Sequence, residues 1–280
     1  MKITYITLFP ELIRHYLEDA FLKKAASKGL MDYEILNLRD FSDNEYRSVD
    51  EKPYGGGDGL ILRPDIANRC FKSLNKSLKT VSIYLSPQGK TLNHDLLKDL
   101  LNYDHIVLLN GRYGGVDQRV INEHIDLEIS IGDFVLSGGE LASLVLTESL
   151  ARLIPGVVGD YRSVEEDSFF YGLLECSQFT RPQSFGEKQN DVPAVLLSGH
   201  HEKIKEWKYS ISLFLTWTRR FDLFQKHIIQ RNFNQQEIGS HYRLIINLKD
   251  EELEVMGFDQ DDRLRYLDYL KKYYSLDGHI

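Results

Sequence analysis

Three glycine-containing loops each follow an apolar segment typical of a buried β-strand, and these loops are the part of the sequence best suited to hold a small ligand. They are residues 86–89 (SPQG), 110–115 (NGRYGG) and 130–139 (SIGDFVLSGG). Glycine lets the backbone approach a ligand closely, and open α/β sheets bind ligands at the carboxyl ends of their strands. Gly-Gly turns also join elements in domains that bind nothing, so it is the convergence of three loops that predicts a site.

The familiar nucleotide-binding motifs are missing from the sequence. No G-x-G-x-x-G follows the first expected strand, and the glycine-rich run 54–59 (YGGGDG) is not a P-loop because no Gly-Lys-Ser/Thr follows it. That run ends a polar, aperiodic stretch, residues 40–59, which is either a ligand clamp or lid, or a plain solvent loop. A ligand that contains adenosine would therefore bind in another way.

The elements that must position these loops follow from hydrophobic periodicity. Strands are expected at 3–8, 33–38, 81–85, 106–109 and 127–131, and helices at 10–28, 64–74, 94–101 and 140–154. The alternation predicts an α/β domain with a parallel sheet and right-handed crossovers. Helical patterns return at 204–217, 221–229 and 253–274. We expect an α/β domain over residues 1–160, a linker over 161–190, and a small helical domain with an acidic tail over 191–280.

Composition sets broad limits on the class of protein. The chain has 280 residues, 42% hydrophobic and 27% charged, with a net charge of −8, which is ordinary for a soluble globular protein. No apolar run reaches the roughly 18 residues of a membrane span, and the N-terminus lacks a signal-peptide layout. Two cysteines are too few for a disulfide framework, and no Cys/His cluster has zinc spacing, so we expect a cytoplasmic protein. The acidic balance argues mildly against nucleic acid as a partner, although a local basic patch can outweigh it.

The motifs, in their order along the chain, resemble one known family. They are RDF (39–41), the RxVDxxPYGGG run (47–57), YLSPQG (84–89), GRYxGxD (111–117), SIGDxVLSGGEL (130–141), RxIPGV (152–157), EDSF (166–169), TRP (180–182) and LLSGxH (196–201). This series is similar to that of the bacterial tRNA (guanine-N1)-methyltransferase family, TrmD, of the SPOUT class. The resemblance covers residues 1 to about 220.

The resemblance implies properties that periodicity does not show. The α/β domain would carry a deep trefoil knot, and the protein would be a homodimer with active sites at the subunit interface. The methyl donor S-adenosyl-L-methionine would bind in the knot loops. The target would be the guanosine immediately 3′ of the tRNA anticodon, methylated at ring nitrogen one. The positions that match the family's donor site are Tyr84, Leu85, Ser86, Pro87, Gly111, Tyr113, Ser130, Ile131, Gly132, Phe134, Val135, Leu136, Gly138 and Gly139.

Two further residues match the family's catalytic pair. Asp167 would be the general base that removes the proton from the guanine nitrogen, and Arg152 would stabilise charge on the guanine carbonyl oxygen. Without the resemblance, Arg152 is a cation in the last turn of a helix, and Asp167 is a solvated charge or a helix cap. The family also brings in Mg²⁺ as an activator, although the sequence offers no site for it.

Several positions depart from the family pattern. Gly114 stands where the family has Glu and Asp58 where it has Pro, while Lys208, Ile211 and Leu215 replace Arg, Gln and Arg in a helix expected to face RNA. Phe134 and Ala142 replace a Tyr and a Pro. These departures leave two alternatives open. One is a diverged SPOUT methyltransferase that acts on another RNA or position, and the other is a non-catalytic relative that binds RNA or the donor.

Overall fold

The computed structural model describes residues 1–18, 20–56, 59–112, 114–186 and 190–274. Two residues singled out from the sequence, Asp58 and Tyr113, lie outside the described residues. The chain divides into two compact units, Met1–Val164 and Glu165–Ile280, which are described separately below. In the described part of the chain, no helix combines the length and hydropathy that crossing a membrane requires.

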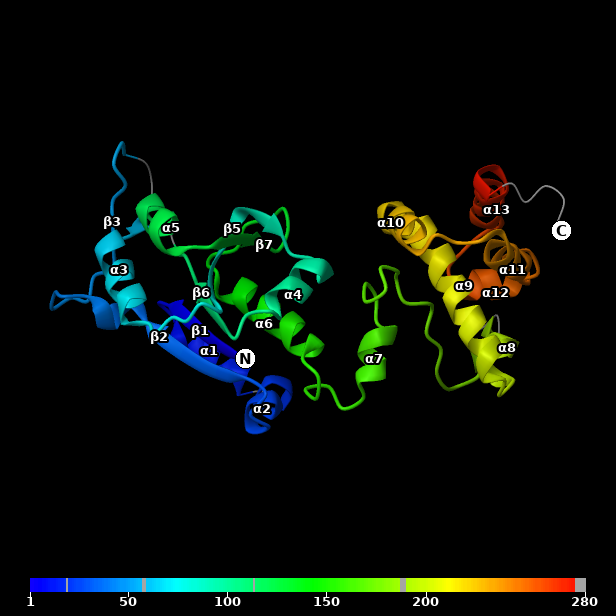
Figure 1. The fold of residues 1–280 in the computed structure, drawn as a ribbon, viewed down its shortest axis with the longest axis horizontal. Coiled ribbons are helices and arrows are strands. Elements are labelled where there is room, and N and C mark those ends of the chain that lie inside the picture. The colour runs from blue at the N-terminus through cyan, green and yellow to red at the C-terminus, as the bar shows by residue number, and fades with distance from the viewer. Residues whose placement is uncertain (19, 57–58, 113, 187–189, 275–280) are drawn as a thin grey trace. The chain divides into compact units, whose positions relative to one another are not determined.

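The first unit is built on a parallel sheet of five strands in the order β2-β1-β6-β5-β7 (Figure 1). The strands are β1 Lys2–Thr7, β2 Asp32–Asn37, β5 Thr80–Thr91, β6 His105–Leu109 and β7 Leu127–Ser130. Residues of β1 and β6 are almost all buried, as expected for the central strands of a sheet covered on both faces. The parallel α/β prediction is therefore confirmed. Since β6, β5 and β7 are neighbours, the loops after their carboxyl ends share one edge.

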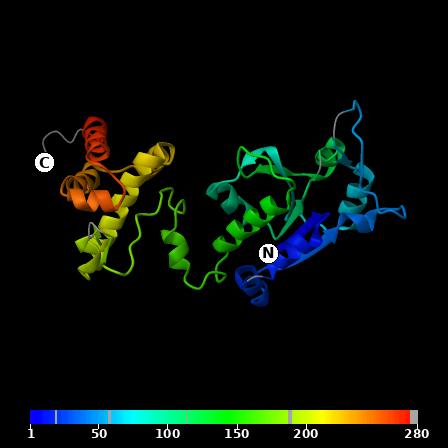
Figure 2. The ribbon, with the colours of Figure 1, turned by 180° about the vertical axis from the view of Figure 1, so that it is seen from behind.

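Helices cover both faces of this sheet. They are α1 Pro10–Leu17, α2 Ala20–Ser27, α3 Pro64–Ser73, α4 His94–Leu100, α5 Gln118–His124 and α6 Glu140–Leu153, with a 3₁₀ turn η1 Leu38–Phe41 and a short hairpin of β3 Asp50–Glu51 and β4 Ile61–Leu62. Helix α7 Tyr161–Glu166 spans the boundary between the two units. Ile6, Val107 and Leu109 pack with α3 on one face. On the other face, the Tyr5 hydroxyl is hydrogen-bonded at 2.6 Å to Thr147 of α6. Helices α1 and α6 lie side by side in both views (Figures 1 and 2).

Two expectations for this unit are wrong in detail. The single helix expected over residues 10–28 is two helices, because α1 ends at Leu17 and Glu18 caps it with an N–H to the Arg14 carbonyl at 3.0 Å. The turn expected at 86–89 lies inside β5, where both Leu85 and Lys90 pair with Ile129. The four residues between them leave the ladder and return to it. A Cβ on Gly89 would lie 2.4 Å from the β7 backbone, so only glycine fits at this return.

The second unit is helical and is organised around α9. Its elements are a hairpin of β8 Ser184–Phe185 and β9 Asn190–Asp191, then α8 Ala194–Leu197, α9 His201–Arg219, α10 Phe221–Arg231, α11 Gln235–Ile246, α12 Asp250–Val255 and α13 Gln260–Tyr274. Helices α8, α10, α11 and α13 all contact α9. Helix α11 was not expected from the sequence. The stretch expected over 253–274 to be acidic and then helical ends in α13, which begins at Gln260, and Gly257 at φ +81° separates this helix from α12.

A buried histidine gives this unit a pH-dependent stability. Burial lowers the pKa of His241 from its usual 6.5 to about 3, and its Nε2 is hydrogen-bonded to the Tyr266 hydroxyl at 2.5 Å. Between these pH values the unfolded chain binds a proton that the folded unit does not bind. The free energy of unfolding should therefore fall by roughly 1.4 kcal/mol for each unit that the pH falls through this window.

Urea unfolding of the full chain at pH 7 and pH 5 checks this expectation. The His241→Phe variant removes the titrating group, so its loss of stability on acidification should be smaller than that of the wild type. A residual loss is expected because burial also lowers the pKa of His227. An equal loss in variant and wild type would show that His241 does not carry the effect.

Candidate active site

The three loops predicted to bind a ligand converge on one cleft in the first unit. Its volume is about 270 Å³, near the lower end of small-molecule sites, which start at roughly 300 Å³. The predicted donor-binding residues that line it are Tyr84, Leu85, Ser86, Pro87, Gly111, Ser130, Ile131, Gly132, Phe134, Val135, Leu136, Gly138 and Gly139. Tyr113, the remaining predicted residue, is outside the described residues. The strand order explains the convergence, because β6, β5 and β7 end side by side.

The cleft wall also contains residues that sequence reasoning did not select. These are Gln88, Arg112, Gly114, Gly115, Ile129, Ser137 and Ala142. Most of them fall between predicted residues, so choosing whole loops rather than motif positions would have found them. Ala142 is buried and lies in the first turn of α6, which begins at Glu140.

A buried ion pair beside the cleft joins the loop after β6, the start of α6 and the end of β1. The Nε of Arg112, in the loop after β6, donates to Glu140 at 2.9 Å. The second oxygen of the Glu140 carboxylate accepts from the Thr7 hydroxyl at 2.8 Å. The Glu140 side chain is only 1% exposed, and the Arg112 guanidinium stacks on the Phe9 ring at 4.2 Å. Because a buried charge is tolerated when it is paired and hydrogen-bonded, this pair fixes the start of α6 against the ends of β1 and β6.

Because Gly138 has no side chain, there is room beside it for this ion pair. A Cβ on Gly138 would lie 2.1 Å from Arg112 Nε and 2.5 Å from the Glu140 carboxylate. The next residue, Gly139, donates its N–H to the Gly111 carbonyl at 3.0 Å. The loop before α6 is thereby held against the loop after β6. This close approach is the physical reason for the Gly-Gly pair seen in the sequence.

The predicted catalytic pair does not fall in one unit. Arg152 is exposed in the last turn of α6, in the first unit. Asp167 follows α7 and belongs to the second unit. The helix-end position expected for Arg152 is confirmed. The positions of the two units relative to each other are not determined. No described site therefore contains both side chains.

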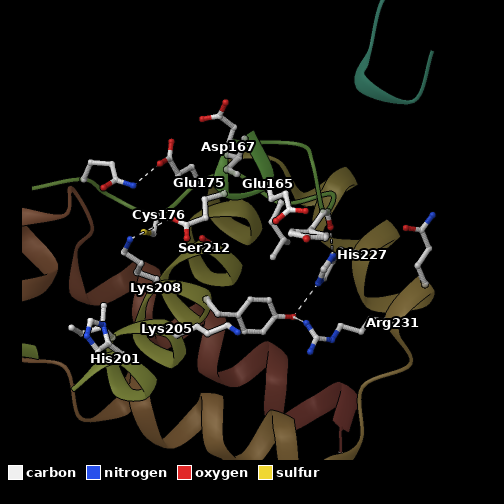
Figure 3. A pocket seen from close by; sticks show the side chains of 18 residues that line it. Glu165, Asp167, Glu175, Cys176, His201, Lys205, Lys208, Ser212, His227 and Arg231 are labelled. Carbon is white, nitrogen blue, oxygen red and sulfur yellow. Dashed lines mark hydrogen bonds and ion pairs between the residues drawn. The ribbon is translucent and has the colours of Figure 1, made fainter. Parts of the chain in front are cut away.

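Asp167 lies at the edge of a larger cavity within the helical unit (Figure 3). This cavity has a volume of about 850 Å³. Its acidic lining residues are Glu165 and Glu166 at the end of α7, and Asp167 and Glu175 in the segment that follows. Its cations Lys205, Lys208 and Arg231 come from α9 and α10. The larger cavity is thus distinct from the glycine-lined cleft. Of the two, the cleft fits a nucleoside better, because backbone groups and close-approaching glycines line it.

The comparison with known proteins agrees with the motif series. A model of the family described as tRNA (guanine-1)-methyltransferase TrmD matches residues 1–226. The chain belongs to this family. The match ends inside α10, so α11, α12 and α13 lie beyond the matched region.

Curated relatives within the TrmD family align with this chain over most of its length and most of their own. A protein of Idiomarina loihiensis named tRNA (guanine-N(1)-)-methyltransferase is 44% identical over 227 residues, which is 80% of this chain and 88% of the relative. A protein of the same name from Clostridioides difficile is 42% identical over 229 residues, 81% of this chain and 98% of the relative. A third, from Borrelia hermsii, is 42% identical over 229 residues and covers 95% of the relative.

One departure from the TrmD pattern has a local structural context. Gly114 lines the cleft and donates its N–H to the Leu60 carbonyl at 2.7 Å. A Cβ at this position would lie 3.0 Å from that carbonyl oxygen, so a larger residue requires residues 59–61 to shift slightly. None of the cleft-lining residues that the structure describes carries a carboxylate. Nor do the described residues include a group of three or more His, Cys, Asp or Glu able to hold a metal ion.

Proposed function

We propose that this protein transfers the methyl group of S-adenosyl-L-methionine to ring nitrogen one of the guanosine immediately 3′ of the tRNA anticodon. One observation carries the proposal: in a chain that belongs to the TrmD family, the loops after three neighbouring parallel strands line a single glycine-rich cleft. The names of the relatives supply the reaction and the substrate class. No observation on the described residues favours a different RNA target or a non-catalytic role.

The cleft has the features that the donor needs. S-adenosyl-L-methionine supplies an electrophilic methyl group on a positively charged sulfur. The adenine edge would be read by backbone N–H and carbonyl groups of the 84–87 and 130–139 loops, while the glycines allow close approach. Tyr84 forms part of the wall, and burial raises the pKa of its hydroxyl, which therefore stays protonated at neutral pH.

Asp167 and Arg152 would act on the guanine rather than on the donor. Neutral guanine carries a proton on ring nitrogen one, so a base must accept that proton as the methyl group arrives. Asp167 is proposed to accept it, a contribution of roughly 10²–10⁴-fold. The negative charge that develops on the guanine carbonyl oxygen would be stabilised by the Arg152 guanidinium. The target base must leave its stack to reach these groups.

The finer topology is also a proposal. We propose that the α/β unit contains the deep trefoil knot of SPOUT proteins. The contacts that support it are those in which the 137–139 loop is fixed against the 110–112 loop, namely the Gly139–Gly111 hydrogen bond and the bridge between Arg112 and Gly138. The β5 excursion at 86–89 meets β7 beside them.

We further propose that the protein is a homodimer through the α1–α6 face. Leu141 and Val145 are 53% and 47% exposed on α6, and Leu12 and Tyr16 are 37% and 40% exposed on α1. Leu141, Val145, Glu148 and Arg152 recur at helical spacing, so they share one side of α6. The Tyr16 hydroxyl donates to Glu148, which joins the two helices into one apolar surface. Surfaces of this kind mark protein interfaces, and this one would place Arg152 at the subunit boundary.

Val145→Arg should break this dimer. A charge placed in the centre of a buried apolar interface costs several kcal/mol, so the variant is expected to sediment as a monomer where the wild type sediments as a dimer. Tyr16 and Glu148 are untouched by the change. Leu264→Arg serves as the control, because Leu264 is 57% exposed on α13 of the helical unit, and it should leave the wild-type assembly intact. If Val145→Arg stayed dimeric, the interface would lie elsewhere.

Two remaining expectations follow from the same proposal. A tRNA-modifying enzyme acts where tRNA is present, so we place the protein in the cytoplasm.

The TrmD family resemblance also implies Mg²⁺ as an activator, but no described cluster of ligands fits a metal ion. We therefore assign no residue to Mg²⁺ and derive no step through it.

Single-turnover methylation tests the proposed function. Purified protein, radiolabelled donor and an unmodified tRNA transcript with guanosine beside the anticodon should give labelled RNA. A matched transcript with adenosine at that position is the control and should remain unlabelled. Equal labelling of both transcripts would show that the target is another nucleotide, and donor binding without label in either would favour a non-catalytic relative.

A further inference from the structure

A chain of hydrogen bonds within the helical unit ends on the segment that carries Asp167 (Figure 3). His227 of α10 bonds the Tyr171 carbonyl through Nδ1 at 2.8 Å. Its Nε2 lies 3.1 Å from the Tyr209 hydroxyl on α9. The Tyr209 oxygen in turn accepts from Arg231 Nη1 at 2.7 Å. Residues from two helices are thus linked in series to a backbone carbonyl four positions after Asp167.

The direction of each hydrogen bond follows from the chemistry of its atoms. A carbonyl oxygen only accepts, so His227 Nδ1 carries a proton and donates to Tyr171. In a neutral imidazole the other nitrogen then accepts, so the Tyr209 hydroxyl donates to Nε2. Burial lowers the pKa of His227 and raises the pKa of Tyr209 to about 12, so both groups are uncharged at neutral pH. The order is therefore Arg231 to Tyr209 to His227 to Tyr171, with each donor matched to an acceptor.

The segment that receives this chain is a tight, self-bonded loop. Phe169 N–H donates to the Leu173 carbonyl at 2.6 Å, and Glu175 N–H donates to the Ser168 hydroxyl at 2.9 Å. Tyr171 lies at the tip of the loop between these bonds. Phe169 has φ +77°, a left-handed conformation that is unfavourable for a residue with a side chain. Such a conformation persists only where contacts around it hold the loop.

The loop has two anchors on the helices. Near its end, Leu174 N–H donates to the Thr216 hydroxyl of α9 at 2.9 Å. At its tip, the Tyr171 carbonyl accepts from His227. The His227 side chain is buried, as is Thr216. Because Asp167 directly precedes the loop, the position of its carboxylate depends on both anchors.

We propose that His227 is a positioning residue for Asp167, acting through the Tyr171 carbonyl and held in turn by Tyr209 and Arg231. This inference rests on the proposed function, in which Asp167 is the general base. His227 and Arg231 follow the last residue matched by the family model, residue 226. We call the series Arg231, Tyr209, His227 and the Tyr171 carbonyl the relay.

Three variants measured together test the relay. His227→Phe removes both imidazole hydrogen bonds, and His227→Asn keeps an N–H donor near the position of Nδ1. His241→Phe is the matched control, since it removes a buried imidazole and its hydrogen bond to Tyr266 in the same unit, away from the loop. The readouts are the single-turnover rate of methyl transfer at saturating donor and tRNA, donor affinity by calorimetry, and the thermal unfolding midpoint.

We expect His227→Phe to lower the single-turnover rate by on the order of 10- to 10²-fold, as small misplacements of a reacting group do, with donor affinity unchanged. His227→Asn should recover most of the rate. His241→Phe should lower the unfolding midpoint and keep the wild-type rate. A wild-type rate in His227→Phe, an equal loss in His241→Phe, or no recovery in His227→Asn would each overturn the relay. Failure of the wild type itself to methylate tRNA would instead overturn the proposed function.

Discussion

Asp167→Asn is expected to lower the single-turnover rate of methyl transfer by roughly 10²–10⁴-fold, the usual value of general-base help, with donor affinity unchanged. The amide has nearly the shape of the carboxylate but cannot accept the proton from guanine. Donor affinity should not change, because the donor cleft is lined by residues of the first unit and Asp167 belongs to the second. Rapid-quench assays with labelled donor measure the rate, and calorimetry measures the affinity.

Glu165→Gln is the matched control for this variant. Glu165 lines the same 850 Å³ cavity as Asp167 and lies two positions before it. The substitution removes one negative charge without touching the proposed base, so the rate should stay near that of the wild type. If the two variants lost activity equally, the cavity's overall charge rather than a specific base would explain the loss. Full activity in Asp167→Asn would assign the base to another group.

Gly138→Ala is expected to weaken donor binding by about 10²-fold or more. The new methyl group would occupy the space of the Arg112–Glu140 pair, which comes within 2.1 Å of it. Disturbing a buried ion pair is costly, and a loss of about 2.8 kcal/mol in binding free energy is a 10²-fold fall in affinity. The loop before α6 must move if the pair is to survive, and that loop is one wall of the cleft. Calorimetric titration with S-adenosyl-L-methionine measures the change.

Gly159→Ala provides the comparison. A Cβ on Gly159 meets no atom within 4 Å, and its φ is not in the left-handed region. This variant belongs to the same unit and adds the same methyl group, so its donor affinity should match that of the wild type. A loss in Gly159→Ala as large as in Gly138→Ala would trace the effect to the backbone rather than to the ion pair. Unchanged affinity in Gly138→Ala would remove the pair from the account of donor binding.

The cleft could be predicted from sequence because it depends on strand ends. Three of the expected strands ended at a glycine-containing loop, and in a parallel sheet the carboxyl ends of neighbouring strands share one edge. The β5 excursion was missed for a related reason. A Ser-Pro-Gln-Gly run looks like a terminating turn, and only the second pairing of Ile129, with Lys90 after Leu85, shows that the strand resumes.

Long-range contacts explain most of what the sequence did not predict. The Arg112–Glu140 pair joins residues 28 positions apart, and the Thr7–Glu140 bond joins residues 133 apart. The hydrophobic periodicity of the sequence does not indicate either contact. Likewise, the link from His227 to Tyr171 spans 56 positions. Such pairings become visible only once the fold brings their elements together.

The departures in α9 have a structural reason that the sequence alone did not give. Ile211 is fully buried and Leu215 is 7% exposed. Both belong to a core that includes Tyr242, Leu253 and Tyr266, residues of the three helices that lie beyond the family match. Apolar residues at these two positions fit this core, since polar side chains there would be buried. They give no reason to infer a different RNA target.

The identity of the methylated nucleoside shows whether this protein methylates ring nitrogen one of the guanosine 3′ of the anticodon. After single-turnover reaction of the wild-type chain with an unmodified tRNA transcript, nuclease digestion and mass spectrometry identify the product and its position. We expect 1-methylguanosine from the fragment that carries the guanosine 3′ of the anticodon. A methyl group on another atom of that base, or on another nucleotide, would contradict it.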